Sequence, residues 1–348
     1  MVLSTERTVT LDDVARHAGV HASTVSRTLS RPDLVNARTL ARVAAAIDQL
    51  GYVPNRAARQ LAGGRTATVA MLVPDITNPF FSSVVQAAQR RAGAAGCLLL
   101  LADTAQDDGT ELDAVRSLAP NVDGLVLCAP VAPTAELLQA AGDRVLVFVN
   151  RRARGVPSVV VDQAALVHLA ATHLRDLGHR RIGAVRGPAG YWSSRQREHA
   201  LAKLAAAAPP GPAGLDLVVL DPVDPTFDGG RAVLPAVVAS GATAVLAFND
   251  VMALGLVAAA AAAGIDVPGR LSVVGADGVP FAAMTTPGLT TVGVDLEALG
   301  DRALEALLAR IGGRRADTSE RAEQTITPRL VVRASSGTAV RPRPPRKG

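Results

Sequence analysis

Three short stretches near the start of the chain carry apolar side chains at helical spacing. The first predicts a helix over residues 10–18, which opens with a Thr-Asp capping pair and ends at Gly19. The second lies in the stretch HASTVSRTL, and the third begins after a capping Asn36 and ends at Gly51. A helix, a turn that contains glycine and a second helix together predict a helix-turn-helix module.

The second of these helices has an apolar and a polar face. Val25 and Leu29 are expected to face inward, which leaves Ala22, Ser23 and Arg27 facing outward. A helix fits the major groove of DNA, where a methyl group can contact thymine and a hydroxyl or guanidinium can contact bases or phosphates. The same side chains would also suit the solvated face of a small helical bundle, and the spacing alone leaves both interpretations open.

The stretch after Gly51, YVPNRAARQLAGGRT, predicts a short basic helix from Asn55 to Leu61. A helix of this length is unstable alone in water, so the segment is expected to fold only against a partner. Leu61 is an apolar side chain on a linker, and one place for it is a base step of the DNA minor groove. The alternative is packing against a neighbouring subunit or domain.

From residue 68 onward, continuous apolar runs alternate with helical stretches. Such runs are typical of parallel strands that helices cover on both faces. The pattern forms two series, so we expect an α/β body of two lobes with parallel sheets, behind a small all-α head. The first series reads VAMLV, CLLLLA, GLVLC and VLVFVN, and the second reads SVVVD, RIGAV, LVVL, AVLAF and SVVGAD.

Polar residues follow the ends of many of these runs. Ligands of open α/β sheets bind beyond the carboxyl ends of the strands, so these residues are candidates for a cleft. Carboxylates, amides and arginines beside aromatic walls suit a polyhydroxylated ligand such as a sugar, and the arginines leave a sugar phosphate open. Some of the candidates would equally serve as helix caps. They are Asp75, Asn78, Asn150, Arg151, Asp162, Ser193 to Arg197, Asn249, Asp250 and Asp277, with Phe80, Phe81, Tyr191 and Trp192 as walls.

The 348 residues carry a formal net charge of +5, which is unevenly distributed. Residues 1–65 hold nine arginines against five acidic residues, and residues 66–328 hold 21 basic against 26 acidic residues. Residues 329–348 hold six basic residues and no acidic ones. A basic head on an acidic body favours an anionic partner at the head. The end RPRPPRKG is expected to be a disordered tail rather than a second contact with nucleic acid.

The cysteines and the N-terminal residues indicate the cellular compartment in which the protein acts. Cys97 and Cys128 each stand in an apolar run, which predicts buried thiols in a reducing environment. The start MVLSTERTVTLDD lacks the apolar stretch of a signal peptide, and no segment has the length of a membrane span. We therefore expect a cytoplasmic, nucleoid-associated protein without membrane contact.

The segment from VTLDDVARHAGV through TVSR to LGYVPNRAARQLAGGRT resembles the DNA-binding head and hinge of the lactose-repressor (LacI) family of bacterial transcription regulators. The segments VPDITNPFF, LGHRRIGAVRGP and AFNDVMALGLVAAAAAAGIDVPGRLSVVGAD resemble, in that order, the family's periplasmic-binding-protein-like effector domain. The resemblance implies a helix-turn-helix domain at 1–53, a hinge at 54–65, a two-lobed effector-binding and dimerisation domain at 66–334 and a disordered basic tail at 335–348.

The resemblance also implies two sets of site residues. The sequence departs from the family pattern at His21, where serine is more usual, and at Ala200 and Leu201, which replace glycine and an aromatic residue. Small residues flank Asp277 at Ala276 and Gly278, which predicts an enlarged pocket. The implied DNA-contact residues are Thr10, Ala22, Ser23, Thr24, Ser26, Arg27, Asn36, Tyr52, Asn55, Arg56, Arg59 and Leu61. The implied effector-contact residues are Asn78, Phe81, Arg151, Asp162, Arg197, Asn249 and Asp277, and we add Trp192 as a candidate apolar wall.

Three other classes of protein fit the sequence less well. The signatures HExxH, GxSxG, GxxxxGKS/T and GxGxxG after a strand do not occur, so we expect no catalytic residues, cofactor or metal. The basic head argues against a secreted sugar-binding protein, and the two-lobed body argues against an architectural DNA protein. We predict a homodimeric or tetrameric repressor that binds a pseudo-palindromic operator and responds to a small sugar-like effector.

Overall fold

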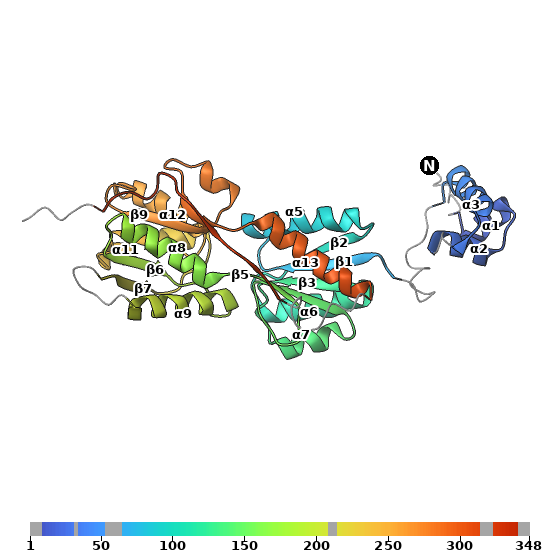
Figure 1. The fold of residues 1–348 in the computed structure, drawn as a ribbon, viewed down its shortest axis with the longest axis horizontal. Helices are drawn as coiled ribbons and strands as arrows, with labels where there is room; N and C mark the ends of the chain where they lie inside the picture. The colour runs from blue at the N-terminus through green and yellow to red at the C-terminus, as the bar shows by residue number, and fades with distance from the viewer. Residues whose placement is uncertain (1–8, 31–33, 53–64, 208–213, 314–322, 340–348) are drawn as a thin grey trace, which may run out of the picture. The chain divides into compact units, whose positions relative to one another are not determined.

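The computed structural model describes residues 9–30, 34–52, 65–207, 214–313 and 323–339. The chain forms two compact units, a head of Met1–Thr66 and a body of Ala67–Gly348 (Figure 1). Four predicted DNA-contact residues of the hinge lie outside the described residues, namely Asn55, Arg56, Arg59 and Leu61.

The described part of the head contains three helices, α1 (Leu11–Ala18), α2 (Ala22–Ser30) and α3 (Ala37–Leu50). A reciprocal capping box opens α1, because the Asp13 N–H donates to the Thr10 hydroxyl and the Thr10 N–H donates to the Asp13 carboxylate. Gly19 and Gly51 end α1 and α3 in the left-handed conformation. The predicted helix-turn-helix is confirmed.

A small apolar core holds the three helices together. Val14, Val25 and Val43 are fully buried within it. Arg42 on α3 donates to the carbonyl oxygen of Ala18 at 2.5 Å. This bond satisfies a free carbonyl at the end of α1 and fixes α3 against the turn of the helix-turn-helix.

Lobe 1 of the body is a six-stranded sheet in the order β11-β5-β4-β3-β1-β2, in which all neighbouring strands are parallel. Alternate residues of β1 enter two apolar cores: Met71 packs on the side of α5 and α13, and Leu72 on the side of α6 and α7. The elements are β1 (Thr68–Val73), α5 (Pro79–Ala94), β2 (Leu98–Asp103), α6 (Asp108–Leu118), β3 (Gly124–Cys128), α7 (Thr134–Ala141), β4 (Val145–Val149), β5 (Ser158–Val161), α13 (Leu296–Ile311) and β11 (Glu323–Ile326).

Lobe 2 is a second six-stranded sheet, in the order β12-β10-β9-β8-β6-β7. Only β12 runs antiparallel to its neighbour among these strands. The predicted α/β body with two mainly parallel sheets is confirmed. The elements are α8 (Gln163–Asp176), β6 (Arg181–Val185), α9 (Trp192–Ala207), β7 (Asp216–Leu220), α10 (Phe227–Ala232), α11 (Leu234–Ala239), β8 (Ala244–Leu246), α12 (Asp250–Ala262), β9 (Ser272–Asp277), β10 (Thr290–Gly293) and β12 (Arg329–Val331), with 3-10 turns at Ala119–Asn121 in lobe 1 and Pro280–Ala283 in lobe 2.

The chain passes between the lobes three times. It leaves lobe 1 after β5 at Asp162, returns after β10 at Asp295 and crosses again between β11 and β12 at residues 327–328. Figure 1 shows the last crossing as the red segment that runs from one lobe into the other. The sequence pattern assigned SVVVD to the second series, and this assignment is wrong, because β5 pairs with β4 in the sheet of lobe 1. Helix α13 and strand β11, which neither series included, also belong to lobe 1 although they follow lobe 2 in the chain.

Helices α5 and α13 lie side by side on lobe 1 because Gly300 has no side chain. A Cβ atom at Gly300 would lie 2.2 Å from the carbonyl oxygen of Val84, inside van der Waals contact. At the solvent edge of the same contact, the Arg90 guanidinium pairs with the Glu297 carboxylate at 2.7 Å. The backbones of the two helices therefore approach one another directly.

Residues 335–339 are part of lobe 2. Ser335 is fully buried, and its Oγ accepts a hydrogen bond from the Thr290 N–H at 2.8 Å. The Ala339 N–H donates at 2.9 Å to a carbonyl at the end of α8. The predicted boundary at residue 334 is therefore too early, and the predicted tail residues 340–348 lie outside the described residues.

The two cysteines are free thiols in different environments. Cys128 at the end of β3 is buried, and burial raises the pKa of its thiol. Cys97 is only half-buried, because it precedes the edge strand β2, whose Leu98 and Leu101 are exposed. The prediction of a buried thiol is right for Cys128 and wrong for Cys97.

Candidate functional site

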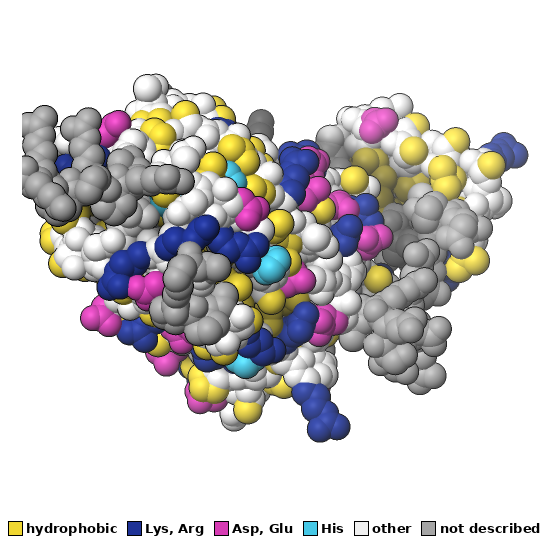
Figure 2. Space-filling view, turned by 60° about the vertical axis from the view of Figure 1, so that its left-hand side comes forward, with side chains coloured by type: hydrophobic (Ala, Val, Ile, Leu, Met, Phe, Trp, Pro, Cys, Tyr) yellow, Lys and Arg dark blue, Asp and Glu magenta, His cyan; other side chains and the backbone are white. Residues whose placement is uncertain are grey.

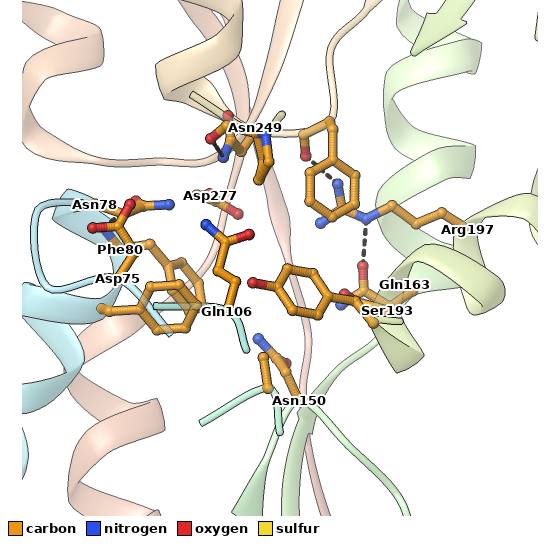
Figure 3. A pocket seen from close by; sticks show the side chains of 15 residues that line it. Asp75, Asn78, Phe80, Gln106, Asn150, Gln163, Ser193, Arg197, Asn249 and Asp277 are labelled. Carbon is orange, nitrogen blue, oxygen red and sulfur yellow. Dashed lines mark hydrogen bonds between the residues drawn. The ribbon is translucent and has the colours of Figure 1, made fainter. Parts of the chain in front are cut away.

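A cavity of about 540 Å³, the interlobe cavity, lies beyond the carboxyl ends of the strands of both lobes (Figure 3). Lobe 1 contributes Asp75, Asn78, Phe80, Phe81, Gln106, Ala129 and Asn150. Lobe 2 contributes Gln163, Tyr191, Ser193, Arg197, Pro225, Phe248, Asn249 and Asp277.

Lobe 1 presents amide side chains on tightly turned backbone. Asn150, directly after β4, has a φ of 54°, and Gln106, in the loop after β2, has a φ of 61°. The Asn150 Oδ1 accepts from the Val161 N–H at 3.1 Å, which fixes the side chain next to the first interlobe crossing. Figure 3 shows the amides of Asn150 and Gln106 directed into the cavity. These loops therefore supply hydrogen-bonding groups for a ligand.

Aromatic rings form the apolar part of the cavity. Phe80 and Phe81 at the start of α5 pack edge to face, with ring centroids 5.0 Å apart. Phe248 and Tyr191 face them from lobe 2. Burial raises the pKa of the Tyr191 hydroxyl, and the carboxylates of Asp75 and Glu111 raise it further, so this hydroxyl is protonated and able to donate.

Arg197 on α9 is held by two groups of lobe 2. Its Nε donates to the Gln163 Oε1 at 2.6 Å, and its Nη1 donates to the Phe248 carbonyl oxygen (Figure 3). Its guanidinium also lies 4.7 Å from the centroid of the Phe248 ring. Burial lowers the pKa of Arg197, and the carboxylates of Asp277 and Asp250 oppose that shift. The arginine is thus fixed in place before any ligand binds.

Asp277 ends β9 and is held in an unusual conformation, with a φ of 114°. The fully buried Asp250 supports the following turn: its Oδ2 accepts from the N–H groups of Gly278 and Val279, each at 2.8 Å. Its Oδ1 accepts from the Thr291 hydroxyl at 2.6 Å. Asp250 thus holds the end of β9, and with it Asp277, against α12.

These two carboxyl groups are close enough to interact. Burial raises the pKa of Asp277 well above its usual range, the Asp250 carboxylate raises it further, and Arg197 lowers it. Burial likewise raises the pKa of Asp250 to about 6, against the lowering effect of its hydrogen bonds. Protonation of one carboxyl would relieve the repulsion between the pair.

Five of the predicted effector residues line the interlobe cavity, namely Asn78, Phe81, Arg197, Asn249 and Asp277. Two of them also cap helices: the Asn78 Oδ1 accepts from the Phe80 N–H at 3.0 Å, and the Asn249 Oδ1 accepts from the Met252 N–H at 2.8 Å. Cap and cavity roles coexist because both helices begin at the cavity.

Three predicted effector residues lie outside the cavity. Arg151 instead donates to two carbonyl oxygens of the loop after β3, at 2.9 and 2.6 Å, and so braces lobe 1. Asp162 caps α8 through a 2.9 Å bond from a backbone N–H. Trp192 has the Arg152 guanidinium 5.5 Å from its ring centroid. In each case another contact holds the side chain outside the cavity.

Sequence reasoning missed several lining residues. Gln106, Pro225 and Phe248 follow strands β2, β7 and β8, so the same position rule could have identified them. Gln163 directly follows the predicted Asp162. No sequence signal distinguishes Gln163 from Asp162 as the one that faces the cavity.

Helix α2 carries five of the twelve predicted DNA contacts. Ser23, Ser26 and Arg27 are exposed, and Ala22 and Thr24 are half-buried. The predicted contacts Thr10 and Asn36 serve as the N-caps of α1 and α3. Tyr52 is buried in the head core at 7% exposure, because the apolar side of its ring packs there, so it does not belong to this surface.

Neither a metal site nor a membrane span occurs among the described residues. No group of three or more His, Cys, Asp or Glu side chains there is placed to hold a metal ion. No described helix combines the length and apolar character needed to cross a membrane. The interlobe cavity therefore offers hydrogen-bonding side chains and aromatic walls for a small molecule.

Two family models match this chain. The model of "Bacterial regulatory proteins, lacI family" matches residues 10–55, and that of "Periplasmic binding protein-like domain" matches residues 171–336. The HTH-type transcriptional repressor PurR of Photobacterium profundum is 32% identical, over 94% of this chain and 98% of the relative. The ribose operon repressor of Escherichia coli is also 32% identical, over 94% and 99%.

Solved structures resemble this one along most of the chain. The lac repressor dimer bound to operator and an anti-inducer has a TM-score of 0.81 at 27% identity, covering 95% of this chain and 100% of that one. A complex of the regulator CelR with cellobiose has a TM-score of 0.67 at 29% identity, covering 94% and 100%. Head and body thus match the same relatives together, and the chain belongs to the LacI family of DNA-binding transcriptional regulators.

Proposed function

We propose that this regulator is a repressor that binds a pseudo-palindromic operator and changes its operator affinity when a neutral, hydroxylated small molecule enters the interlobe cavity. The observation that carries the proposal is the convergence of amides, carboxyls and aromatic rings from both lobes on one cavity. Relatives solved with ribose and with cellobiose support a sugar as the ligand. We expect the protein to act in the cytoplasm, where it meets DNA.

A neutral sugar fits the cavity better than a sugar phosphate. Arg197 is the only arginine among the described residues that line the cavity, and two of its nitrogens already donate to Gln163 and Phe248. Asp75 and Asp277 add carboxyl groups that would repel an anion. Vicinal hydroxyls, in contrast, can donate to carboxyl and amide oxygens while the C–H face of a sugar packs on the phenylalanine rings.

The operator contact is proposed to lie on the exposed face of α2. Ser23, Ser26 and Arg27 would reach base edges and phosphates, with the methyl of Ala22 beside them. The charge supports this placement, since residues 1–65 are net basic while residues 66–328 are net acidic. Figure 2 shows both basic and acidic side chains on one face of the body.

Response to the effector is proposed to arise from its contacts with both lobes. A ligand that bridges Asn150 in lobe 1 and Asp277 in lobe 2 binds best when the lobes are close together. Three chain crossings, at Asp162, Asp295 and residues 327–328, are the places where the lobes can pivot. If the effector binds the closed arrangement of the lobes more tightly than the open one, it shifts the equilibrium between them and thereby changes operator affinity.

A homodimer is proposed as the DNA-binding form. A lac repressor of similar fold was solved as a dimer on its operator. Exposed apolar side chains on this chain would be covered in such an assembly: Leu98 and Leu101 on the edge strand β2, and Phe281 and Met284 near β10. Sedimentation at micromolar concentration should give twice the chain mass, and four times that mass would indicate the tetramer instead.

Selection of duplexes from a random library with the full-length protein tests the DNA half of this proposal. We expect a two-fold symmetric consensus. The selected duplex is then titrated in the presence of a panel of neutral sugars, where at least one should change operator affinity about 5- to 150-fold, the usual range of coupling. A protein that selects no sequence, or whose operator affinity no sugar alters, would contradict the proposal.

A further inference from the structure

A second cavity, the inner cavity, lies within lobe 2 and shares a wall with the interlobe cavity. Arg197 and Phe248 line both cavities. The inner cavity is a small space between strands β6 and β8 and helices α8 and α9. Ser193 and Ser194 are neighbours on α9, and the first lines the interlobe cavity while the second lines the inner one.

Two hydrogen-bond donors of the inner cavity have no acceptor among the described residues. They are the Oγ of Ser194, a residue with only 1% exposure, and the Nε of Arg186, which is also buried. A buried donor without an acceptor costs about 1–3 kcal/mol. The Nη2 of the same guanidinium pairs with the Asp221 carboxylate at 2.9 Å, so the charge of Arg186 already has a counter-ion. A neutral ligand oxygen placed in the inner cavity could therefore accept hydrogen bonds from both donors.

Apart from Arg197 and one carboxylate, the rest of the inner cavity is apolar. Val167, Ala184 and Leu201 form a small buried cluster that lines it. Such a floor favours a methyl group over a hydroxyl group. Glu198, one turn along α9 from Ser194, also lines the cavity and offers an acceptor.

We propose that the inner cavity is a subsite for an acetamido substituent of the effector, so that the protein responds to an N-acetylated sugar. The inference rests on the proposed function. The sugar ring occupies the interlobe cavity, and the substituent passes the edge of the Phe248 ring. Its carbonyl oxygen accepts from Ser194 and Arg186, its N–H donates to Glu198, and its methyl group packs on the apolar floor.

Calorimetric titration of the full-length protein with paired sugars tests this subsite. The pairs are N-acetylglucosamine and glucose, N-acetylgalactosamine and galactose, and N-acetylmannosamine and mannose. In at least one pair the N-acetylated sugar should bind at least tenfold more tightly than its parent. Filling the cavity with Leu201→Phe, or removing the hydroxyl with Ser194→Ala, should lower the affinity for the N-acetylated sugar about tenfold and leave that for the parent sugar unchanged.

An exposed position on the same helix supplies the control, since His199→Ala should leave both affinities unchanged. Ser194→Ala removes a single oxygen, so it keeps the test informative if Leu201→Phe fails to fold. Equal binding within every pair, or a preference that survives both substitutions, overturns the subsite and leaves the proposed function standing. If no sugar of these pairs binds, the inference is also overturned, and the operator titration with the wider panel decides the proposed function separately.

Discussion

The guanidinium of Arg152 lies 5.5 Å from the centre of the Trp192 ring, and the two residues belong to different lobes. Arg152 follows β4 and is anchored in lobe 1 by a 2.6 Å ion pair with Glu323 on β11. Trp192 begins α9 in lobe 2. The contact therefore joins the lobes beside the interlobe cavity and exists only when they are close together.

Because Trp192 is the only tryptophan of the chain, its fluorescence should report this contact directly. We expect Arg152→Ala to shift the emission maximum to longer wavelength and to weaken effector binding two- to fivefold, since an exposed cation–π contact contributes about 0.5–1 kcal/mol. Arg154→Ala changes an exposed arginine two residues away and is the matched control. Identical emission spectra for the two variants would show that Arg152 does not hold the ring.

Arg27 is the residue of the α2 face with the greatest expected effect on DNA binding. Arg27→Ala should weaken binding to the selected operator by about 1–3 kcal/mol if the guanidinium contacts a base, and should relax selectivity at that position. Effector binding should be unchanged. Arg116→Ala, on α6 of the body, should leave operator affinity unchanged; if both variants bind the operator like the parent protein, Arg27 is not at the interface.

The carboxyl pair of Asp250 and Asp277 should make the stability of the body depend on pH. Folding raises both pKa values, so the folded form gains stability as the pH falls from 7 toward 5 and loses it as the pH rises through the folded-state values. Asp277→Asn removes one buried charge and should raise the unfolding midpoint of the body by about 2–4 °C at pH 7, or about 1 kcal/mol, and by less at pH 5. Effector binding should be lost.

Asp250→Asn should have the opposite effect, since an amide cannot accept the hydrogen bonds from Gly278, Val279 and Thr291 as a carboxylate does. Thermal unfolding of both variants at pH 5 and pH 7 distinguishes the destabilising charge of Asp277 from the stabilising hydrogen bonds of Asp250. A lower midpoint for Asp277→Asn at pH 7 would mean that its charge stabilises the fold.

Gly300 should tolerate no side chain. Gly300→Ala places a Cβ against the Val84 carbonyl oxygen and should cost about 1–3 kcal/mol, because two packed helices would have to separate. Gly93→Ala on α5 is the matched control: a Cβ there meets nothing within 4 Å, so the substitution should stabilise the helix by about 0.5–1 kcal/mol. Denaturant unfolding of the two variants measures the difference, and equal stability would contradict direct helix contact.

Most of the fold could be predicted because its signals are local. Thr10 and Asn36 mark helix starts through their own side-chain chemistry, and a run such as VAMLV is apolar throughout because both of its faces are buried. The placement of α13 and β11 in lobe 1 could not be predicted. Apolar residues indicate that a strand is buried, but they carry no information on which of two similar sheets it joins.

The candidate site could be predicted only as far as chain position determines it. The rule that ligands bind beyond strand ends identifies Asp277 and Arg151 equally well, yet only Asp277 lines the interlobe cavity. The carbonyl partners that turn Arg151 away lie about twenty residues earlier in the chain, and no local pattern reveals them. Side-chain direction is therefore a property of tertiary structure.

The third crossing between the lobes also affects the order of folding during synthesis. Strand β11 completes the edge of one sheet and β12 completes the edge of the other, and both lie within residues 323–331. Neither lobe can close its sheet until these residues have left the ribosome, whereas the core of the head is complete once Tyr52 has emerged. The DNA-binding part of the nascent chain can therefore fold first, and the two effector-binding lobes acquire their final edges together when residues 323–331 emerge.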